Sequence, residues 1–271
     1  MSVTESPLTP RVTTVNTRRL PGARAILALM LREMTTAYGR SPGGYVWAIA
    51  SPVAMVLILT AVFTIIMRSP PLGTSFPFFY ATGYLPFVLF LTMTYAVAGS
   101  IRYSRQLLKF PAVTWVDAIA ARSLLALLTS SVIFLIVLPS VMVVFSVSTV
   151  FDPKLMLLAW VMIAVLGLGI GAMNCYIVGT FPAWESAWQI LTRPLFFVSG
   201  IIFLPENMPP WVGEIILWNP VSHGVLMMRR GTFPTYAGDY ISVVYPLAVG
   251  GFLLLLGLIL IRRNYQAILN G

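Results

Sequence analysis

Long apolar runs separated by short polar connections constrain this sequence more than any motif does. A helix needs roughly 20 apolar residues to cross the hydrocarbon core of a bilayer, and six runs come close to that length or exceed it. They cover residues 47–67, 78–101, 118–147, 155–179, 187–204 and 241–261. With 58% hydrophobic and 9% charged residues, the chain has the composition of an integral membrane protein. We therefore predict an all-α fold with six transmembrane helices.

The basic residues are unevenly divided between the two sides that these helices would define. Twelve of the 17 Lys and Arg residues lie before the first run, between the second and third runs with the start of the third, or after the last run. Arg68, Lys154, Arg229 and Arg230 fall on the other side. Because basic residues accumulate on the cytoplasmic side, we expect both termini to be cytoplasmic. The charges flank apolar runs and form no patch, which argues against a nucleic-acid partner.

The residues before the first run divide into two parts. Residues 1–20 carry Pro, Ser and Thr without periodicity and are expected to form a flexible cytoplasmic tail, with no signal peptide at the start. From 21 to 46, Leu27, Met30, Leu31 and Met34 recur at helical spacing. This pattern predicts an amphipathic helix in the plane of the membrane interface, followed by a connection. The helix could be a simple anchor or could have a mechanical role. Residues 47–271 would form the transmembrane domain.

The stretch from 199 to 240 contains two apolar pieces that are too short to cross a bilayer. The first gives way to Pro205-Glu206-Asn207-Met208-Pro209-Pro210, and the second, from Trp211 to Trp218, is interrupted by Asn219-Pro220. Proline removes a backbone donor and ends a helix, and irregular backbone survives at membrane depth only beside protein or a water-filled cavity. We predict a re-entrant helical hairpin over about 199–231.

Two aromatic segments are candidates for contact with a transported molecule. The connection into the first run carries Tyr38, Arg40, Tyr45 and Trp47 around Gly43-Gly44. It could gate a lipid headgroup, although composition alone favours a plain interfacial turn. In the second run, Tyr84 has a flat face and a polar edge that could contact a sugar, but tyrosines are more common in the interfacial aromatic belt.

Two basic features also invite a functional interpretation. Arg102, Arg105 and Lys109 are three and four residues apart, so they share one face of a predicted short helix that ends before Pro111. That helix could dock a cytoplasmic partner, or its charges could only enforce topology. Arg193 lies inside the fifth run, where an arginine is costly and therefore a functional candidate, unless it snorkels to the interface. Gly167 and Gly171 form a small-xxx-small pair that weakly favours dimer packing.

Several classes of chemistry are missing from the sequence. The chain has one histidine, His223, and one cysteine, Cys175, so clusters of histidines that bind metals and internal disulfides are excluded. The eight acidic residues are scattered, and no phosphate-binding G-x-x-x-x-G-K-[ST] pattern occurs. We therefore expect no catalysis, metal or cofactor in this chain. If ATP drives it, another subunit hydrolyses the nucleotide. His223 is expected to have a structural role.

Several short segments follow one another in a recognisable order. They are Leu31-Arg32-Glu33, Tyr38-Gly39-Arg40-Ser41, Gly44, Trp47-Ala48, Pro52, Gly83-Tyr84-Leu85-Pro86-Phe87, Leu107-Leu108-Lys109-Phe110-Pro111-Ala112-Val113, Asn219-Pro220-Val221-Ser222-His223-Gly224 and Met228-Arg229-Arg230-Gly231. In this order the chain resembles the permease subunits of type-2 ABC exporters of bacterial surface polysaccharides. It is most similar to the capsular polysaccharide exporters of Gram-negative inner membranes, and O-antigen and teichoic acid permeases are also similar.

The resemblance implies a homodimer in the bacterial inner membrane that works with two cytoplasmic ATPase subunits, which would bind ATP and Mg. The substrate would be a lipid-linked polysaccharide that passes through a channel at the dimer interface. Periplasmic adaptor and outer-membrane export proteins would be further partners. Pro42-Gly43 departs from the family, whose members more often carry a bulkier residue before the glycine.

The resemblance also implies roles for individual residues. ATPase coupling would involve Arg102, Arg105, Leu108, Lys109, Phe110 and Glu185. The lipid gate would involve Arg32, Tyr38, Arg40, Tyr45 and Trp47, and the channel Tyr84, Trp188 and Arg193. An external gate would involve Pro205, Asn207, Trp211, Asn219 and His223.

Two other classes of function are weaker alternatives. A membrane-embedded enzyme of lipid or glycan metabolism would need His, Asp or Glu clustered at one membrane face, and the sequence lacks such a cluster. A passive channel would need neither the basic segment 102–110 nor an ATPase. Nothing in the sequence specifies the sugar composition, length or lipid anchor of a polymer.

Overall fold

The computed structural model describes residues 21–37, 44–109 and 113–270, and within these ranges the fold is helical with no β-strand. The α-helices are α1 (Pro21–Ala37), α2 (Gly44–Ile66), α3 (Phe76–Ala98), α4 (Ser100–Ser104), α5 (Trp115–Val144), α6 (Pro153–Thr180), α7 (Trp184–Phe197), α8 (Pro210–Trp218), α9 (Pro220–Thr232) and α10 (Val244–Asn270). Two 3-10 turns, η1 (Leu107–Lys109) and η2 (Pro205–Asn207), complete it. The predicted all-α class is confirmed.

Polar residues and prolines at the helix starts explain several of these boundaries. Thr114 and Asp117 form a reciprocal capping box at the start of α5. Asp152 accepts hydrogen bonds from two backbone N–H groups at the start of α6, and Asn219 caps α9 by accepting one from the N–H of Val221. Pro139 lies inside α5, which continues to Val144.

Among the described residues, five helices are long and apolar enough to cross a membrane. They lie at Val46–Ile66, Phe76–Ala98, Trp115–Val144, Pro153–Thr180 and Val244–Gln266. The expected fifth span, 187–204, differs: α7 has 14 residues and ends at Phe197, which gives a length of about 21 Å. The chain then turns at Gly200, whose φ is 69°, a conformation that favours glycine. The six-span architecture and the re-entrant hairpin therefore stay predictions.

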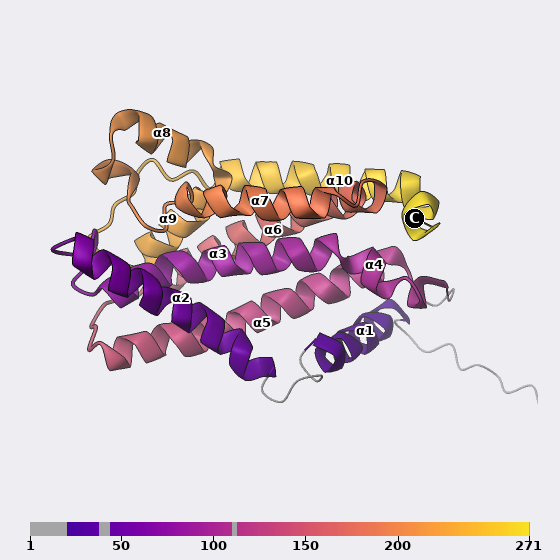
Figure 1. The fold of residues 1–271 in the computed structure, drawn as a ribbon, viewed down its shortest axis with the longest axis horizontal. Coiled ribbons are helices and arrows are strands. Elements are labelled where there is room, and N and C mark those ends of the chain that lie inside the picture. The colour runs from indigo at the N-terminus through magenta and orange to yellow at the C-terminus, as the bar shows by residue number, and fades with distance from the viewer. Residues whose placement is uncertain (1–20, 38–43, 110–112, 271) are drawn as a thin grey trace, which may run out of the picture.

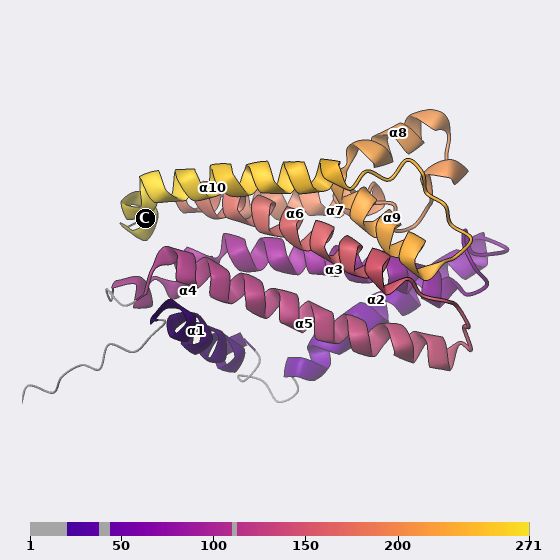
Figure 2. The ribbon, with the colours of Figure 1, turned by 180° about the vertical axis from the view of Figure 1, so that it is seen from behind.

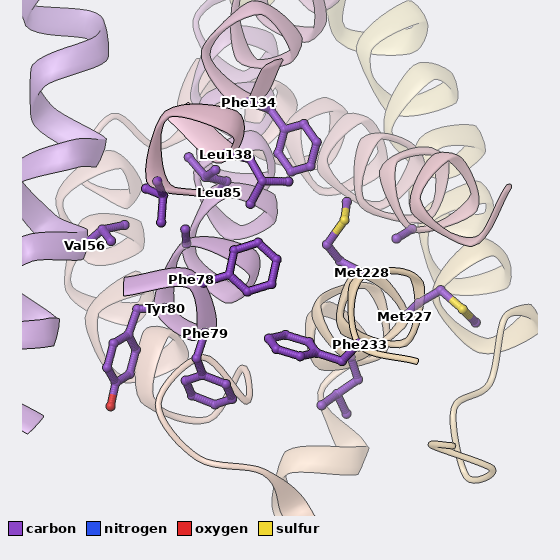
Figure 3. Close-up of a cluster of buried hydrophobic side chains, with 14 of the residues drawn as sticks. Val56, Phe78, Phe79, Tyr80, Leu85, Phe134, Leu138, Met227, Met228 and Phe233 are labelled. Atoms are coloured by element: carbon purple, nitrogen blue, oxygen red, sulfur yellow. The ribbon is translucent and has the colours of Figure 1, made fainter. Parts of the chain in front are cut away.

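Long helices run side by side along the molecule, and two groups of short elements lie at its opposite ends (Figures 1 and 2). One end holds α1, α4 and the carboxyl end of α10, and we call it the basic end. The other holds α8 and α9, and we call it the α9 end. Aromatic and sulfur-containing side chains from α3, α5 and α9 form a buried cluster towards the α9 end (Figure 3).

The helix α6 lies between α3 and α10 and approaches both at backbone distance. A Cβ added to Gly169 would lie 2.1 Å from the carbonyl oxygen of Gly250 in α10, and one added to Gly167 would lie 2.8 Å from Cβ of Met93 in α3. On Gly171 it would meet Val97 of α3 at 2.7 Å. The pair Gly167 and Gly171 thus packs within one chain, and its weak indication of a dimer contact is wrong.

The helix α1 contacts α5 through a face that the sequence pattern did not single out. Leu29 is buried there, whereas Leu27, Leu31 and Met34 of the predicted apolar face are exposed on the surface of the protein. The side chain of Arg32 is also exposed. An apolar face left uncovered by protein is what an interfacial helix needs, and the interfacial position stays a prediction.

Candidate functional site

An ion pair at the basic end joins α4 to α7. The guanidinium of Arg102 donates to both carboxylate oxygens of Glu185, at 2.6 and 2.9 Å. These hydrogen bonds raise the pKa of Arg102 and lower the pKa of Glu185. Both side chains keep a large part of their surface exposed, 50% and 39%. Two residues predicted to act in ATPase coupling are therefore in direct contact.

A second ion pair joins α5 to α1 and lies beside the first. Nη2 of Arg122 is 2.9 Å from Oε1 of Glu33, and its Nη1 donates to the carbonyl oxygen of Gly99 at 3.1 Å. The ring of Tyr103 is close to both arginines, with its centroid 4.5 Å from Cζ of Arg122 and 5.3 Å from Cζ of Arg102. The four charged groups thus connect α1, α5, α4 and α7. Sequence reasoning counted Arg122 only as a topological charge and missed this role.

The coupling segment differs from its prediction. We expected one helix from Arg102 to Phe110, but α4 ends at Ser104 and a separate 3-10 turn follows at Leu107–Lys109. Arg105 is exposed, whereas Leu108 is buried at 7% exposure in a hydrophobic cluster. Leu108 therefore anchors the segment to the bundle instead of facing a partner. The side chain of Lys109, and Phe110 altogether, lie outside the described residues.

A cavity of about 330 Å³ opens beside the two ion pairs. Both pairs contribute to its wall, together with residues of α3, α5, α6 and α7. Trp188, predicted to line a channel, is one of these residues, and Asn174 of α6 is another. Asn174 accepts a hydrogen bond from the indole of Trp184 at 2.9 Å. On the wall, the hydroxyl of Tyr95 is 3.1 Å from that of Thr192.

A groove of about 420 Å³ adjoins this cavity, and Thr92 and Thr129 line both spaces. Tyr84 and Trp47, predicted separately as channel and gate residues, both line the groove. Arg193, the third predicted channel residue, is exposed on α7 and lines neither space. Tyr38, Arg40 and the side chain of Tyr45 lie outside the described residues.

The predicted external gate residues lie at the α9 end but have different environments. Asn207 and Trp211 are exposed, whereas Pro205 is buried. Asn219 caps α9 and donates to the carbonyl oxygen of Val198 at 3.1 Å and the hydroxyl of Ser199 at 3.0 Å. It thereby ties the start of α9 to the turn after α7.

His223 is held on both ring nitrogens. Nδ1 accepts from the N–H of Ser242 at 3.1 Å, so the proton lies on Nε2, which donates to the carbonyl oxygen of Leu217 at 2.9 Å. Burial lowers the pKa of His223 and favours this neutral form. The arrangement fits the structural role expected for the residue, because it ties α9 to the end of α8 and to the segment that precedes α10.

Arg229, which sequence reasoning treated only as an outward-facing charge, is fully buried in α9. Its guanidinium donates to the carbonyl oxygens of Gly200 and Ile201 at 2.5 and 2.6 Å, and Cζ lies 3.9 Å from the centroid of the Phe79 ring. Burial lowers its pKa to about 10, which leaves it protonated near neutral pH. Gly83 makes room, because a Cβ there would lie 2.7 Å from Nη2 of Arg229.

Arg229 therefore fixes the turn that ends α7. The available sequence signal was weak: Val225, Leu226 and Met228 on the preceding turn are all apolar, which favours burial of this stretch of helix. Within the described ranges, no group of three or more His, Cys, Asp or Glu residues could hold a metal ion.

A sequence model of the ABC-2 type transporter family matches residues 24–233, from α1 to the end of α9. The chain belongs to this family. Both ion pairs, the cavity and the Arg229 site are built from residues inside the matched range. The helix α10 and Ser242 lie outside the matched range.

Two similar proteins match this chain over most of their length, and a third matches over about a third of its length. The polysialic acid transport protein KpsM of Escherichia coli is 31% identical over 243 residues, which cover 90% of this chain and 94% of the relative. The capsule polysaccharide export inner-membrane protein CtrC of Neisseria meningitidis serogroup A is 27% identical over 89% and 91%. The O-antigen export system permease protein RfbA of Myxococcus xanthus is 33% identical, but over only 32% of this chain and 34% of the relative.

Proposed function

We propose that this chain is the membrane-spanning subunit of an ATP-driven exporter that moves lipid-linked capsular polysaccharide across the bacterial inner membrane. The near full-length similarity to proteins named for polysialic acid transport and capsule polysaccharide export carries this proposal. An O-antigen or teichoic acid exporter is the alternative. It has less support, because the O-antigen permease matches only a third of the chain.

ATP hydrolysis would take place in two separate cytoplasmic subunits, which would bind ATP and Mg. The sequence carries no phosphate-binding loop, and the segment Ser100–Lys109 offers exposed basic groups for docking at Arg102 and Arg105. A push on this segment would act on α7 through Glu185, and on α1 through Tyr103, Arg122 and Glu33. The two ion pairs give the coupling a physical route.

The transport path would lie at the interface of a homodimer, with both termini in the cytoplasm. Tyr84 and Trp47 line the same groove, which supports a role for both in contacting the substrate or its lipid. The segment over about 199–231, held by Arg229, would close the path at the periplasmic side. Periplasmic adaptor and outer-membrane proteins would continue the route.

Charge reversal of the ion pair tests this function. In a strain that lacks its own capsule permease, Arg102→Glu and Glu185→Arg should each reduce surface polysaccharide at least about tenfold, because like charges then repel across α4 and α7. The double variant restores the pair but still lacks the docking charge at position 102, so it should export more than either single variant and less than wild type. Arg263→Glu, an exposed charge on α10, is the matched control.

Co-purification separates this function from the other classes. The wild-type permease should bring down a soluble ATPase. The Arg102→Glu permease should stimulate ATP hydrolysis by that ATPase less than the wild type does. An enzyme or a passive channel would be isolated alone. Unchanged export by both single variants, with normal amounts of protein, would contradict the proposed coupling route.

A further inference from the structure

The helix α10 bends near its carboxyl end, at the basic end of the molecule (Figure 1). The bend is at Asn264, whose φ of −111° and ψ of 16° lie outside the helical region. Its side-chain Nδ2 donates to the carbonyl oxygen of Leu260 at 3.0 Å. In a regular helix that oxygen accepts from the backbone N–H of residue 264, and a side chain that enters this pattern bends a helix. We call residues 264–270 the terminal turn.

One side chain of the terminal turn packs tightly against the end of α6. Ile268 is 9% exposed. A Cβ added to Gly179 of α6 would lie 2.6 Å from Cγ2 of Ile268 and 2.9 Å from its Cγ1, so the contact depends on a glycine at position 179. Because packed interiors leave little room for even one extra methyl group, this contact holds the terminal turn in one position on α6.

The same side chain belongs to the cluster that anchors the coupling segment, residues 100–109. Ile268 shares a buried hydrophobic cluster with Ile101 of α4 and Leu108 of η1, and Cys175 of α6 is a further member. The two arginines of the coupling segment are exposed. The segment therefore has a buried side that packs with α6 and α10, and an exposed side that a partner can reach.

Contacts of different kinds hold the two sides of the coupling segment. The exposed side is joined to α7 by the Arg102–Glu185 ion pair, a type of contact that water screens and that can rearrange. The buried side is held by apolar side chains in a packed interior, which deforms little. A force on the exposed side should therefore displace the segment about its buried side. Without a firm contact there, the whole segment would shift and less of the displacement would reach Glu185.

We propose that the terminal turn is a positioning element for ATPase coupling, in which Ile268 holds the buried side of the coupling segment against α6. A push from the ATPase then moves α7 instead of displacing the whole segment. The inference rests on the proposed function. It adds to the proposed coupling route a fixed point supplied by residues outside the family match, which ends at residue 233.

A double-mutant cycle between Gly179 and Ile268 tests this role. Surface polysaccharide is measured in the complemented strain, and ATP hydrolysis is measured on the purified permease–ATPase complex in lipid nanodiscs. Gly179→Ala pushes a methyl group into Ile268, and Ile268→Ala leaves a void. Each should lower export about three- to tenfold, while ATP hydrolysis stays near the wild-type rate because the docking arginines are unchanged.

The double variant distinguishes this contact from general damage to the protein. In Gly179→Ala/Ile268→Ala the added methyl group enters the space that the isoleucine side chain has left. Export should therefore be higher than in either single variant, although two independent losses would make it lower. Ile268→Val keeps Cγ1 and Cγ2, the two atoms nearest to Gly179, and should export as the wild type does.

Two control variants are matched to these changes. Ile241→Ala removes the same side chain at the same exposure, 9%, from the buried cluster towards the α9 end. It should lower the thermal unfolding midpoint about as much as Ile268→Ala, but export relative to ATP hydrolysis should stay at the wild-type level. Gly251→Ala adds a methyl group to α10 where nothing lies within 4 Å, and it should change neither measurement.

The outcomes separate the terminal turn from the function on which it rests. If the wild-type chain and its ATPase export no glycan, the proposed function fails, and the inference fails with it. If the wild type exports but Ile268→Ala and Gly179→Ala keep its ratio of export to ATP hydrolysis, only the role of the terminal turn is refuted. An equal loss of that ratio in Ile241→Ala, or no recovery in the double variant, would also refute it.

Discussion

At the basic end, Arg102 and Arg122 are paired with carboxylates and connect four helices, whereas at the α9 end Arg229 is fully buried between two carbonyl oxygens and an aromatic ring. In the first arrangement, the Arg102–Glu185 pair is substantially exposed, so water can replace its contact. The second has no substitute for its hydrogen bonds. We infer that the basic end is suited to rearrangement and that the α9 end is suited to holding one conformation.

The strongest way to test this comparison is to remove the buried arginine. Arg229→Met should lower the free energy of unfolding by about 2–5 kcal/mol, because the carbonyls of Gly200 and Ile201 lose their partners in a buried site. The thermal unfolding midpoint in detergent measures the change. Arg230→Met, at a half-buried neighbour, should stay within about 0.5 kcal/mol of wild type. Equal effects of the two variants would remove the special status of Arg229.

Crowding the guanidinium should have a smaller effect than removing it. Gly83→Ala places a methyl group against Nη2 of Arg229 and should cost about 1–3 kcal/mol. Gly251→Ala is the matched control, since nothing lies within 4 Å of its added Cβ, and its higher helix propensity should make it neutral or stabilising. A Gly83→Ala protein as stable as wild type would show that Arg229 can move aside.

Acid should weaken the α9 end through His223. Its folded-state pKa is lowered, so the unfolded chain binds the proton more readily and the stabilisation is complete above the unfolded pKa of about 6.5. As the pH falls from 7.5 to 5.5, part of this stabilisation should be lost. His223→Gln should abolish this dependence in thermal unfolding measured across the range. A profile that is unchanged in His223→Gln would assign the titration to another group.

Breaking the exposed ion pair should have the smallest effect on stability. Glu185→Gln should cost less than about 1 kcal/mol, because both partners are substantially exposed and water replaces the contact. The loss should shrink further in 1 M salt. A loss as large as that of Arg229→Met, measured by the same thermal unfolding, would erase the contrast between the two ends.

The sequence predicted the local features of the fold well. The bounds of α2, α3, α5 and α6 agree with the predicted runs to within three residues, because apolar runs of that length have few other ways to satisfy their backbone groups in a membrane. The predicted length of the helix at α7 was wrong because contacts far apart in the sequence decide where it ends. Its end is set by the turn at Gly200, and that turn is held by Arg229 far along the chain.

The candidate site was predicted only in part, because contacts between distant parts of the sequence also decide which of its residues meet. Arg102, Glu185, Trp188, Tyr84 and Trp47 were selected by residue type or family resemblance, but their grouping depends on how the helices pack. Asn174 and Arg122 gave no local signal. Asn174 lies in an apolar run and Arg122 near the start of one, and only the packed structure shows that both line the cavity.

The glycine contacts of α6 have a mechanical consequence. At these glycines, α6 approaches α3 on one side and α10 on the other at backbone distance. No layer of long side chains separates the three helices there, so they should move as one rigid unit. The helix α7 buries only Thr192 by comparison. A displacement applied at the basic end would then move α7 relative to α3, α6 and α10, which would keep their mutual positions. The helix α7 would be the hinge of any transport cycle.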